Sequence, residues 1–308
     1  MKVFLTGATG VAGRATVPAL VAAGHDVRAV SRRPEASAVL EGAGAEPVAV
    51  DLFDARAVAD AVIGSEAVVH LATHVPEMSR AARPKGWEQH NRLRVEATEH
   101  LVAAARAAGA ARFVKESITF VYQGAGDAWI DEESPLLPDL GLLAPTIEGE
   151  QRALDFAADG GTATVLRFGL FYGGAGNRGT DENLRLARFR RSQIAGDATA
   201  FMSSIHCDDI AGAVVAALTV PTGVYNVTDD EPLTRGEYLA AFGAAFGVKT
   251  PKPTPARLVK LLGGPSAEGL LASQRVSNRK FRDASGWAPA HRDAREGWAA
   301  VAAARGEG

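Results

Sequence analysis

The stretch TGATGVAG, Thr6–Gly13, stands between an apolar run that begins at Lys2 and a segment of helical period. In this context Gly7 permits a tight turn, Gly10 lets the backbone approach a pyrophosphate, and Gly13 lets strand and helix pack closely. The N-terminus of the helix offers N–H groups and a positive dipole end to phosphates. The stretch therefore predicts a dinucleotide-binding turn, with a purely structural glycine turn as the alternative. Its expected contacts are Gly7, Thr9, Gly10, Val11 and Gly13.

Strand-like and helical segments alternate along the first half of the chain. Short apolar runs are followed by alanine-rich stretches of helical period, which favours right-handed crossovers and a parallel sheet covered by helices on both faces. We therefore predict an α/β fold with a Rossmann-type doubly wound parallel sheet, in which 87–108 is one long helix and 162–172 one strand. Residues 1–172, with returning segments at about 204–229, are expected to form the dinucleotide-binding domain. Residues 173–203 and 230–308 are expected to form a smaller C-terminal substrate lobe.

The composition excludes several classes of protein. A net charge of −3 over 308 residues gives no electrostatic case for nucleic acid or an anionic membrane. Cys207 is the single cysteine, so no internal disulfide or cysteine-based metal cluster is expected, and a reducing compartment is favoured. The apolar stretch that begins at Ala211 is far shorter than the roughly 20 residues of a membrane span. We expect a cytoplasmic, soluble protein of bacterial composition that binds a small molecule and no metal.

The residues after the second strand-like run distinguish between the two nicotinamide cofactors. An acidic residue there binds the ribose 2′-hydroxyl of NAD, whereas this chain has SRRPE from Ser31. Guanidinium groups pair well with phosphate, so Ser31, Arg32 and Arg33 favour NADP over NAD, with a solvated arginine pair as the alternative. After the next strand-like run, Asp51 is placed to accept a hydrogen bond from an adenine amino group. Asp54 is the better candidate for the cap of the following helix.

With these residues in place, the chain resembles the extended short-chain dehydrogenase/reductase family of the NAD-dependent epimerase/dehydratase type. TGATGVAG matches the TGxxGxxG motif of that family, and VVHLAT (68–73) is similar to its motif after the fourth strand. ARFVKESITFVY (111–122) resembles the fifth strand and serine loop, and LRFGLFYGGAGN (166–177) resembles the substrate loop. The resemblance implies a possible homodimer through the long helix and the helix after Thr146. It also implies that the cofactor pocket includes Leu52, Leu71, Ala72 and Thr73.

The chain departs from that family where the chemistry is done. The family uses a tyrosine phenol as the proton donor, and a lysine four residues later tunes the phenol and holds the nicotinamide ribose. If Glu150 is the glutamate that follows this lysine, the lysine position is Thr146 and the tyrosine position is Leu142. The serine position falls on Ile118, between Ser117 and Thr119, which alternation places together on the other face of the strand. General acid–base help is worth roughly 10²–10⁴-fold, so the usual mechanism is expected to be absent.

Several residues are candidates to replace the missing groups. His74 follows the fourth strand and is a candidate to protonate an alkoxide, although a solvated loop histidine is the alternative. Lys115 is a charged residue in a strand that is expected to be buried, so it must reach the carboxyl edge of the sheet or find a partner. Thr119 needs a local twist to reach the site, and Tyr122 is usually structural at its place in the family. The expected substrate contacts are Tyr172, Asn177 and Glu148, and the basic stretch 185–193 binds an anionic group or forms a solvated helix.

The sequence predicts an NADP-dependent oxidoreductase or epimerase-like enzyme that acts on a small carbonyl or hydroxyl metabolite with a non-standard proton donor. Two alternatives stay open. One is a non-redox enzyme on the same scaffold, which performs a cyclisation or an elimination. The other is a non-catalytic NADP-binding sensor, since a fold does not fix a function.

Overall fold

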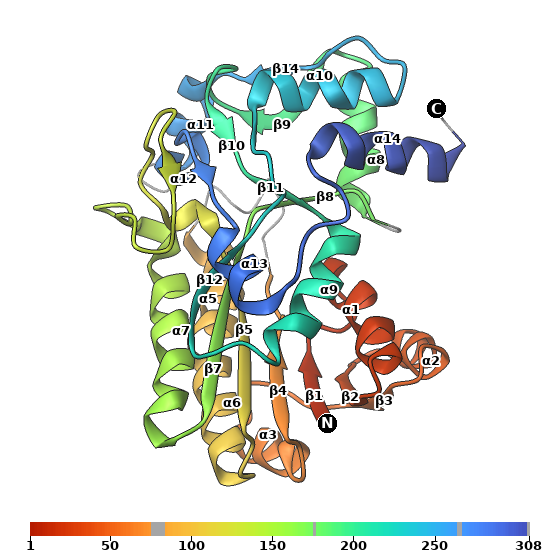
Figure 1. Ribbon diagram of the computed structural model, residues 1–308, viewed down its shortest axis with the longest axis vertical. Coiled ribbons are helices and arrows are strands. Elements are labelled where there is room, and N and C mark those ends of the chain that lie inside the picture. Colours follow the sequence, from red (N-terminus) through yellow and green to blue (C-terminus); the bar gives the residue numbers. More distant parts are fainter. Residues whose placement is uncertain (75–83, 175–176, 264–266, 307–308) are drawn as a thin grey trace.

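The fold is built on one seven-stranded sheet. The computed structural model describes residues 1–74, 84–174, 177–263 and 267–306 (Figure 1). Strand pairs in the sheet are parallel, in the order β12-β7-β5-β4-β1-β2-β3. The predicted α/β fold with a Rossmann-type doubly wound parallel sheet is confirmed. The strands are β1 (Lys2–Thr6), β2 (Asp26–Val30), β3 (Glu46–Val48), β4 (Ala67–His70), β5 (Arg112–Ile118), β7 (Thr162–Phe168) and β12 (Gly223–Val227).

Alternate residues of the strands enter two hydrophobic cores, one on each face of the sheet. On β1, Val3 and Leu5 belong to one core and Phe4 to the other. This is the pattern of strands buried on both faces, and it explains their nearly continuous apolar sequence. The first core is covered by α1 (Val11–Ala22), α2 (Pro34–Gly42) and α9 (Cys207–Ala217). The second is covered by α3 (Ala55–Val62), α5 (Glu88–Arg94), α6 (Glu96–Ala107) and α7 (Ala144–Leu154).

A third core lies beyond the carboxyl edge of the sheet, at the top of Figure 1, where Trp298 packs against Tyr172, Tyr238 and Phe242. The longest described helices have 12 residues, and none is long and apolar enough to cross a membrane. The remaining strands are β6 (Trp129–Ile130), β8 (Leu170–Tyr172), β9 (Arg191–Ala195), β10 (Phe201–Met202), β11 (Ser204–His206), β13 (Leu233–Thr234), β14 (Lys252–Thr254) and β15 (Arg275–Val276). The remaining helices are η1 (Pro84–Trp87), η2 (Thr119–Val121), η3 (Gly141–Leu143), η4 (Asp155–Asp159), α8 (Arg178–Ala187), α10 (Arg235–Ala245), α11 (Ala256–Gly263), α12 (Ala267–Leu271), α13 (Arg279–Ser285) and α14 (Ala294–Arg305).

Two predicted elements are divided. The helix expected over 87–108 is interrupted at Val95, where a φ of −107° and a ψ of −69° depart from regular helical values. The break lies beside a close approach of α7, because a Cβ on Gly149 would stand 2.2 Å from the Arg94 carbonyl oxygen. The strand expected over 162–172 is interrupted at Gly169, and β8 leaves the main sheet to pair with β11. The proposed division of the chain into two domains stays a prediction.

Candidate functional site

The glycine turn is shaped as the sequence predicts for a pyrophosphate. Gly7 has a φ of +78°, and a Cβ there would lie 2.5 Å from the backbone of Leu71. A Cβ on Gly13 would lie 2.2 Å from the Gly7 carbonyl oxygen, so helix α1 starts in contact with the turn. No side chain caps α1 at Gly10, which leaves its first N–H groups available to phosphate oxygens. Val11 is exposed beside them, and the Thr9 carbonyl accepts from the Arg14 side chain.

The ends of β2 and β3 carry the residues that the sequence assigned to the adenosine half of the cofactor. Arg32 and Arg33 are exposed, and within the described chain neither side chain has an ion-pair partner. Ser31 is buried, and its hydroxyl donates to the Arg33 carbonyl, 3.2 Å away. Asp51 is exposed and accepts from the Phe53 N–H. The predicted cap is confirmed, because Asp54 accepts from two N–H groups in the first turn of α3.

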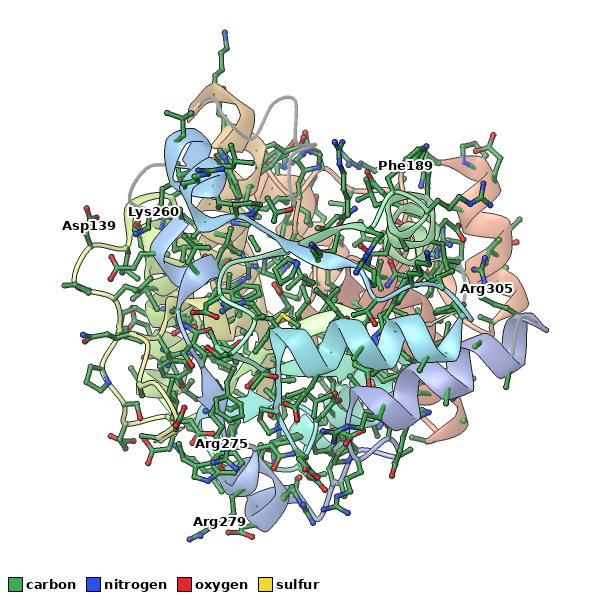
Figure 2. The ribbon with its side chains drawn as sticks, turned by 90° about the horizontal axis from the view of Figure 1, so that it is seen from above. Asp139, Phe189, Lys260, Arg275, Arg279 and Arg305 are labelled. Carbon is green, nitrogen blue, oxygen red and sulfur yellow. The ribbon has the colours of Figure 1, made fainter. Side chains whose placement is uncertain are left out.

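If the two arginines bind a 2′-phosphate, the double change Arg32→Ser and Arg33→Ser is expected to weaken NADPH binding by about 10- to 100-fold, because hydrogen bonds to charged groups contribute about 1.5–3 kcal/mol. NADH affinity is expected to change little, since NADH lacks that phosphate. Fluorescence titration with both cofactors measures the difference. Arg279→Ser is the matched control, since Arg279 lies at the periphery (Figure 2) with a mostly exposed side chain. Equal losses for NADPH and NADH contradict the assignment.

The other predicted cofactor contacts lie along the carboxyl edge. Leu71 is buried and its N–H donates to the Thr6 carbonyl, while Ala72 is half-buried. Leu52 is buried, and its carbonyl accepts from His100. Thr73 is exposed, with its hydroxyl 3.4 Å from Nδ1 of His90. The described positions therefore run from the glycine turn to the ends of β4 and β5, and the cofactor role of these residues stays a proposal.

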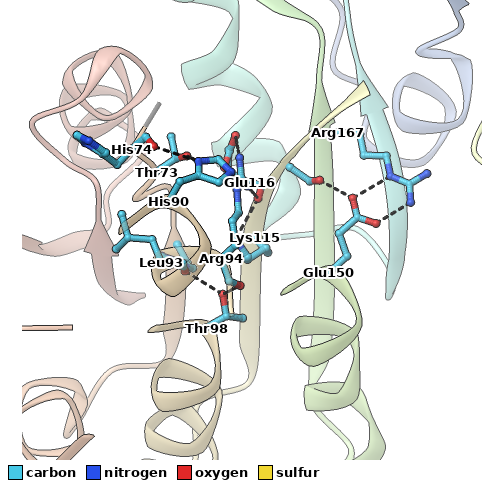
Figure 3. A network of polar contacts seen from close by, with 12 residues as sticks. Thr73, His74, His90, Leu93, Arg94, Thr98, Lys115, Glu116, Glu150 and Arg167 are labelled. Atoms are coloured by element: carbon cyan, nitrogen blue, oxygen red, sulfur yellow. Dashed lines mark hydrogen bonds and ion pairs between the residues drawn. The ribbon is translucent and has the colours of Figure 1, made fainter. Parts of the chain in front are cut away.

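A buried ion pair lies beside the end of β5 (Figure 3). Arg94, on α5, pairs with both carboxylate oxygens of Glu116, at 2.5 and 3.1 Å, and also donates to the Glu116 carbonyl. Both side chains are at least 96% buried. The sequence reasoning missed Arg94, although its spacing to Ala97, Thr98 and Leu101 places it on the core face of the helix.

Lys115 lies next to this pair and is itself 1% exposed. Its ammonium nitrogen donates to the Glu116 carbonyl, 3.2 Å away, and it forms no ion pair within the described residues. Burial, and then the nearby Arg94 charge, lower the pKa of Lys115 to about 7. The amine is therefore partly uncharged at neutral pH, unlike an ordinary surface lysine.

A second network continues from Ser117. Its hydroxyl donates to Glu150, and the Glu150 carboxylate pairs with Arg167 at 2.6 and 2.9 Å. The Arg167 guanidinium lies over the ring of Tyr122, whose hydroxyl donates to Asn226. Burial raises the pKa of Tyr122 to about 12. Tyr122 is therefore bonded in the interior and poorly suited to donate or accept protons near neutrality, so its placement gives no support to the predicted catalytic role.

Several buried polar atoms around the ends of β4 and β5 have no hydrogen-bond partner among the residues that the structure describes. Buried polar groups are normally bonded in folded proteins, so such atoms point to a ligand. His90 is informative: its Nδ1 donates to the His74 carbonyl, and burial followed by Arg94 lowers its pKa to about 3, which leaves Nε2 as a free acceptor. These residues fit a polar group such as a carboxamide or ribose. The unpartnered atoms are His90 Nε2, Asn91 Oδ1, Arg94 Nε, Thr119 Oγ1 and Thr146 Oγ1.

Helix α7 provides neither of the two groups that the family uses. Thr146 is buried at the position assigned to the lysine, and Leu142 is half-buried in η3 at the position assigned to the tyrosine. The buried face of α7 consists of Thr146, Gly149, Glu150 and Ala153. Thr119 begins η2 instead of continuing β5, so the strand alternation expected for it ends at Ile118. Both threonine hydroxyls are buried, and the orphan hydroxyl of Thr146 was not foreseen from sequence.

The other predicted residues lie apart from this cluster. Glu148 was expected to point into the pocket, but its carboxylate is on the exposed side of α7 and pairs with Arg152. Tyr172 is buried in the third core, where aromatic side chains surround its ring. Its hydroxyl donates to the Asp293 carbonyl. Asn177 caps α8 with its side chain. His74 is exposed, and its ring points away from Lys115 (Figure 3).

The basic stretch 185–193 is exposed, as the alternative interpretation expects, but it is not one helix, because α8 ends at Ala187 and β9 begins at Arg191. Its arginine side chains are exposed, and Phe189 within it is 73% exposed at the periphery of the molecule (Figure 2). Exposed arginines of this kind are solvated rather than directed toward an enclosed ligand. This stretch gives no support to an anion site.

The glycine turn and the polar cluster at the ends of β4 and β5 define a Rossmann-type α/β protein with a site at the carboxyl edge of its sheet. Residues 3–228 match the model of the NAD dependent epimerase/dehydratase family, and the chain belongs to this family. A 3-diazoavenalumate denitrifying reductase from a Streptomyces species is 36% identical over 312 aligned residues, which cover 96% of this chain and 99% of the relative.

Solved structures of similar proteins contain either nicotinamide cofactor. The human epimerase family protein SDR39U1, solved with NADPH, has a TM-score of 0.80 and 26% identity, and the match covers 98% of this chain and 99% of that one. MoeE5, solved with UDP-glucose and NAD, has a TM-score of 0.78 and 26% identity, with 98% of each chain covered. The choice between the two cofactors therefore depends on residues of this chain.

Proposed function

We propose that the protein is an NADPH-dependent reductase that delivers hydride to an electron-poor acceptor without proton transfer from a tyrosine. The observation that carries this proposal is the buried face of α7, which presents Thr146 and Gly149 and contributes no phenol or amine. The glycine turn that is predicted to bind the cofactor is present. A hydride transfer that needs no proton donor can proceed without the tyrosine and the lysine of the family. Ketone reduction, in contrast, needs a proton donor.

The acceptor class that fits best is a diazonium compound bearing a carboxylate. The Streptomyces relative is named for removing nitrogen from a diazo compound, and it aligns with almost the whole chain. Bound NADPH supplies a hydride. Addition of hydride to the terminal nitrogen of an arenediazonium ion gives a neutral diazene, whose C–N bond then breaks to release N₂ and leave the hydrogen on carbon. The sum is Ar–N₂⁺ plus NADPH giving Ar–H, N₂ and NADP⁺, so no proton is taken up or released.

The charges of the site suit a cationic acceptor. Glu116 neutralises Arg94 and Glu150 neutralises Arg167, and both pairs are buried. Among the described residues at the ends of β4 and β5, the buried charge left without an ion-pair partner is that of Lys115, whose lowered pKa of about 7 lets it become neutral. Because an uncompensated positive charge of low solvent exposure repels a nearby cation strongly, the neutral amine favours binding of a diazonium ion. NADPH rather than NADH is supported by the position of Arg32 and Arg33 directly after β2, where a protein selective for NAD has an acidic residue.

The test supplies the purified protein with NADPH deuterated at C4 and an arenediazonium carboxylate. We expect absorbance at 340 nm to fall, one N₂ to be released for each NADPH consumed, and deuterium to appear on the carbon that carried nitrogen. A reaction without protein corrects for direct reduction by NADPH. A parallel panel of ketones and aldehydes is expected to be reduced at least about 100-fold more slowly, the size of effect that loss of a general acid produces.

Three outcomes contradict the proposal, and each identifies an alternative. Ketone reduction without N₂ release indicates a conventional oxidoreductase with a substitute proton donor. Product formation with no loss of NADPH indicates a non-redox cyclisation or elimination. Tight NADPH binding with no product from any substrate indicates a sensor.

A further inference from the structure

We propose that Lys115 supplies, from strand β5, the amine that helix α7 lacks, and that this amine holds the nicotinamide ribose. The inference rests on the proposed use of NADPH and deepens it, because it assigns the role of the missing lysine to a different element. The evidence is the slot in which the lysine lies, its unused hydrogen-bond donors, and the charges around it.

The first observation is the slot between β5 and α7. Lys115 pairs in register with His70 on one side and Val165 on the other. A Cβ on Gly149 would lie 3.5 Å from Cε of Lys115 and 2.2 Å from the Arg94 carbonyl oxygen. The lysine stem therefore lies against α7 where residue 149 has no side chain. Residues three apart share a helix face, so Gly149 and Thr146 border the same space.

The second observation is the unsatisfied bonding at the end of this slot. An ammonium group has three donors, and within the described part of the chain Lys115 Nζ has one acceptor, the Glu116 carbonyl. The hydroxyls of Thr119 and Thr146, on η2 and α7, are buried and have no partner in the described ranges. A buried amine without a carboxylate partner is costly for the fold, so this amine, together with the unpartnered hydroxyls on η2 and α7, indicates a polar ligand.

The third observation concerns the charged groups that surround Lys115. Arg94 and His90 face it from α5, His70 from β4, Glu150 from α7 and Glu116 from its own strand. Burial holds the pKa of His70 well below its usual range and, together with Arg94, that of His90 at about 3. Of these three bases, Lys115, with its pKa of about 7, is therefore the one that changes charge between pH 6 and 9.

This charge change distinguishes the two redox forms of the cofactor. The oxidised nicotinamide ring is cationic and the reduced ring is neutral. Below pH 7 the ammonium form of Lys115 repels the oxidised ring, and above pH 7 the neutral amine does not. The ratio of the NADP⁺ dissociation constant to the NADPH dissociation constant must therefore rise as the pH falls through 7.

The experiment measures both dissociation constants by fluorescence and calorimetry from pH 6 to 9, without substrate. The variants are Lys115→Met, Lys115→Met with Thr146→Lys, and Lys252→Met as an exposed control. We expect Lys115→Met to weaken NADPH binding by about tenfold, as for loss of a hydrogen bond from a charged donor. We also expect it to remove the pH dependence of the ratio. Restoring an amine from α7 in the double variant is expected to recover part of the affinity, and the control should match the wild type.

The proposal is overturned if the wild-type ratio does not change between pH 6 and 9, a result that needs no variant to fold. It is also overturned if folded Lys115→Met keeps the pH dependence or binds NADPH as tightly as the wild type. The proposal is also overturned if the folded double variant binds NADPH no more tightly than Lys115→Met. If Lys115 had only a structural role, a new amine on α7 would not restore affinity for NADPH. Since no substrate is present, absence of N₂ release counts against the proposed reaction and leaves this assignment intact.

Discussion

Replacing Gly13 by Ala is expected to reduce NADPH affinity by at least about 100-fold, the loss expected when the close helix–strand contact of a dinucleotide turn is removed. The added Cβ would lie 2.2 Å from the Gly7 carbonyl oxygen and 2.5 Å from Cα of Ala8, both backbone atoms of the turn. Neither atom can move without shifting the N-terminus of α1 away from the phosphates. Titration with NADPH, together with a melting curve for the folded fraction, measures the effect.

The matched control for this change is Gly42→Ala. A Cβ at Gly42, at the end of α2, would meet nothing within 4 Å, and its φ is not in the left-handed region. The same methyl is expected to leave NADPH binding unchanged there, with a small gain in stability because Ala suits a helix better than Gly. If Gly13→Ala binds NADPH within threefold of the control, the turn does not hold the pyrophosphate.

Replacing Arg94 by Met is expected to lower the free energy of unfolding by about 3–5 kcal/mol, the usual cost of leaving one member of a buried ion pair alone. Glu116 would keep a carboxylate that is 4% exposed and has lost two charged hydrogen bonds. Replacing both residues by Met is expected to recover more than half of that loss, because an apolar pair of similar volume removes the unpaired charge. Urea denaturation of the four variants in the cycle measures these energies.

The exposed pair of Arg279 and Asp283 provides the comparison, since its side chains are 87% and 74% exposed. Arg279→Met is expected to change the free energy of unfolding by less than about 0.5 kcal/mol. A loss below about 1 kcal/mol for Arg94→Met would show that water reaches Glu116 and that the ion pair is not an enclosed part of the site.

The residues predicted to bind substrate have contacts that sequence reasoning did not foresee. Motif position placed Glu148 on the right helix, but a helix has several faces, and packing against α5 and β5 selected Gly149 and Glu150 for the interior. Tyr172 and Asn177 follow a strand at the carboxyl edge, as binding residues often do. The Tyr172 hydroxyl is used by the Asp293 carbonyl, 121 residues away, and no local signal announces that partner. The Asn177 side chain caps the start of α8 through the N–H of Gly179, only two residues away.

Local sequence was sufficient for the sheet, the shape of the glycine turn and the cap at Asp54. Each depends on residues that are close together in the chain, where backbone geometry and periodicity act directly. Only the tertiary structure decided which residues meet in the buried polar networks at β5. Arg94 and Glu116 are 22 residues apart, and Ser117, Glu150 and Arg167 come from three elements. These groups come into contact through the register of β5 with its neighbours and through the packing of α5 and α7 against the sheet. Burial in this position lowers the pKa of Lys115 and so sets its charge.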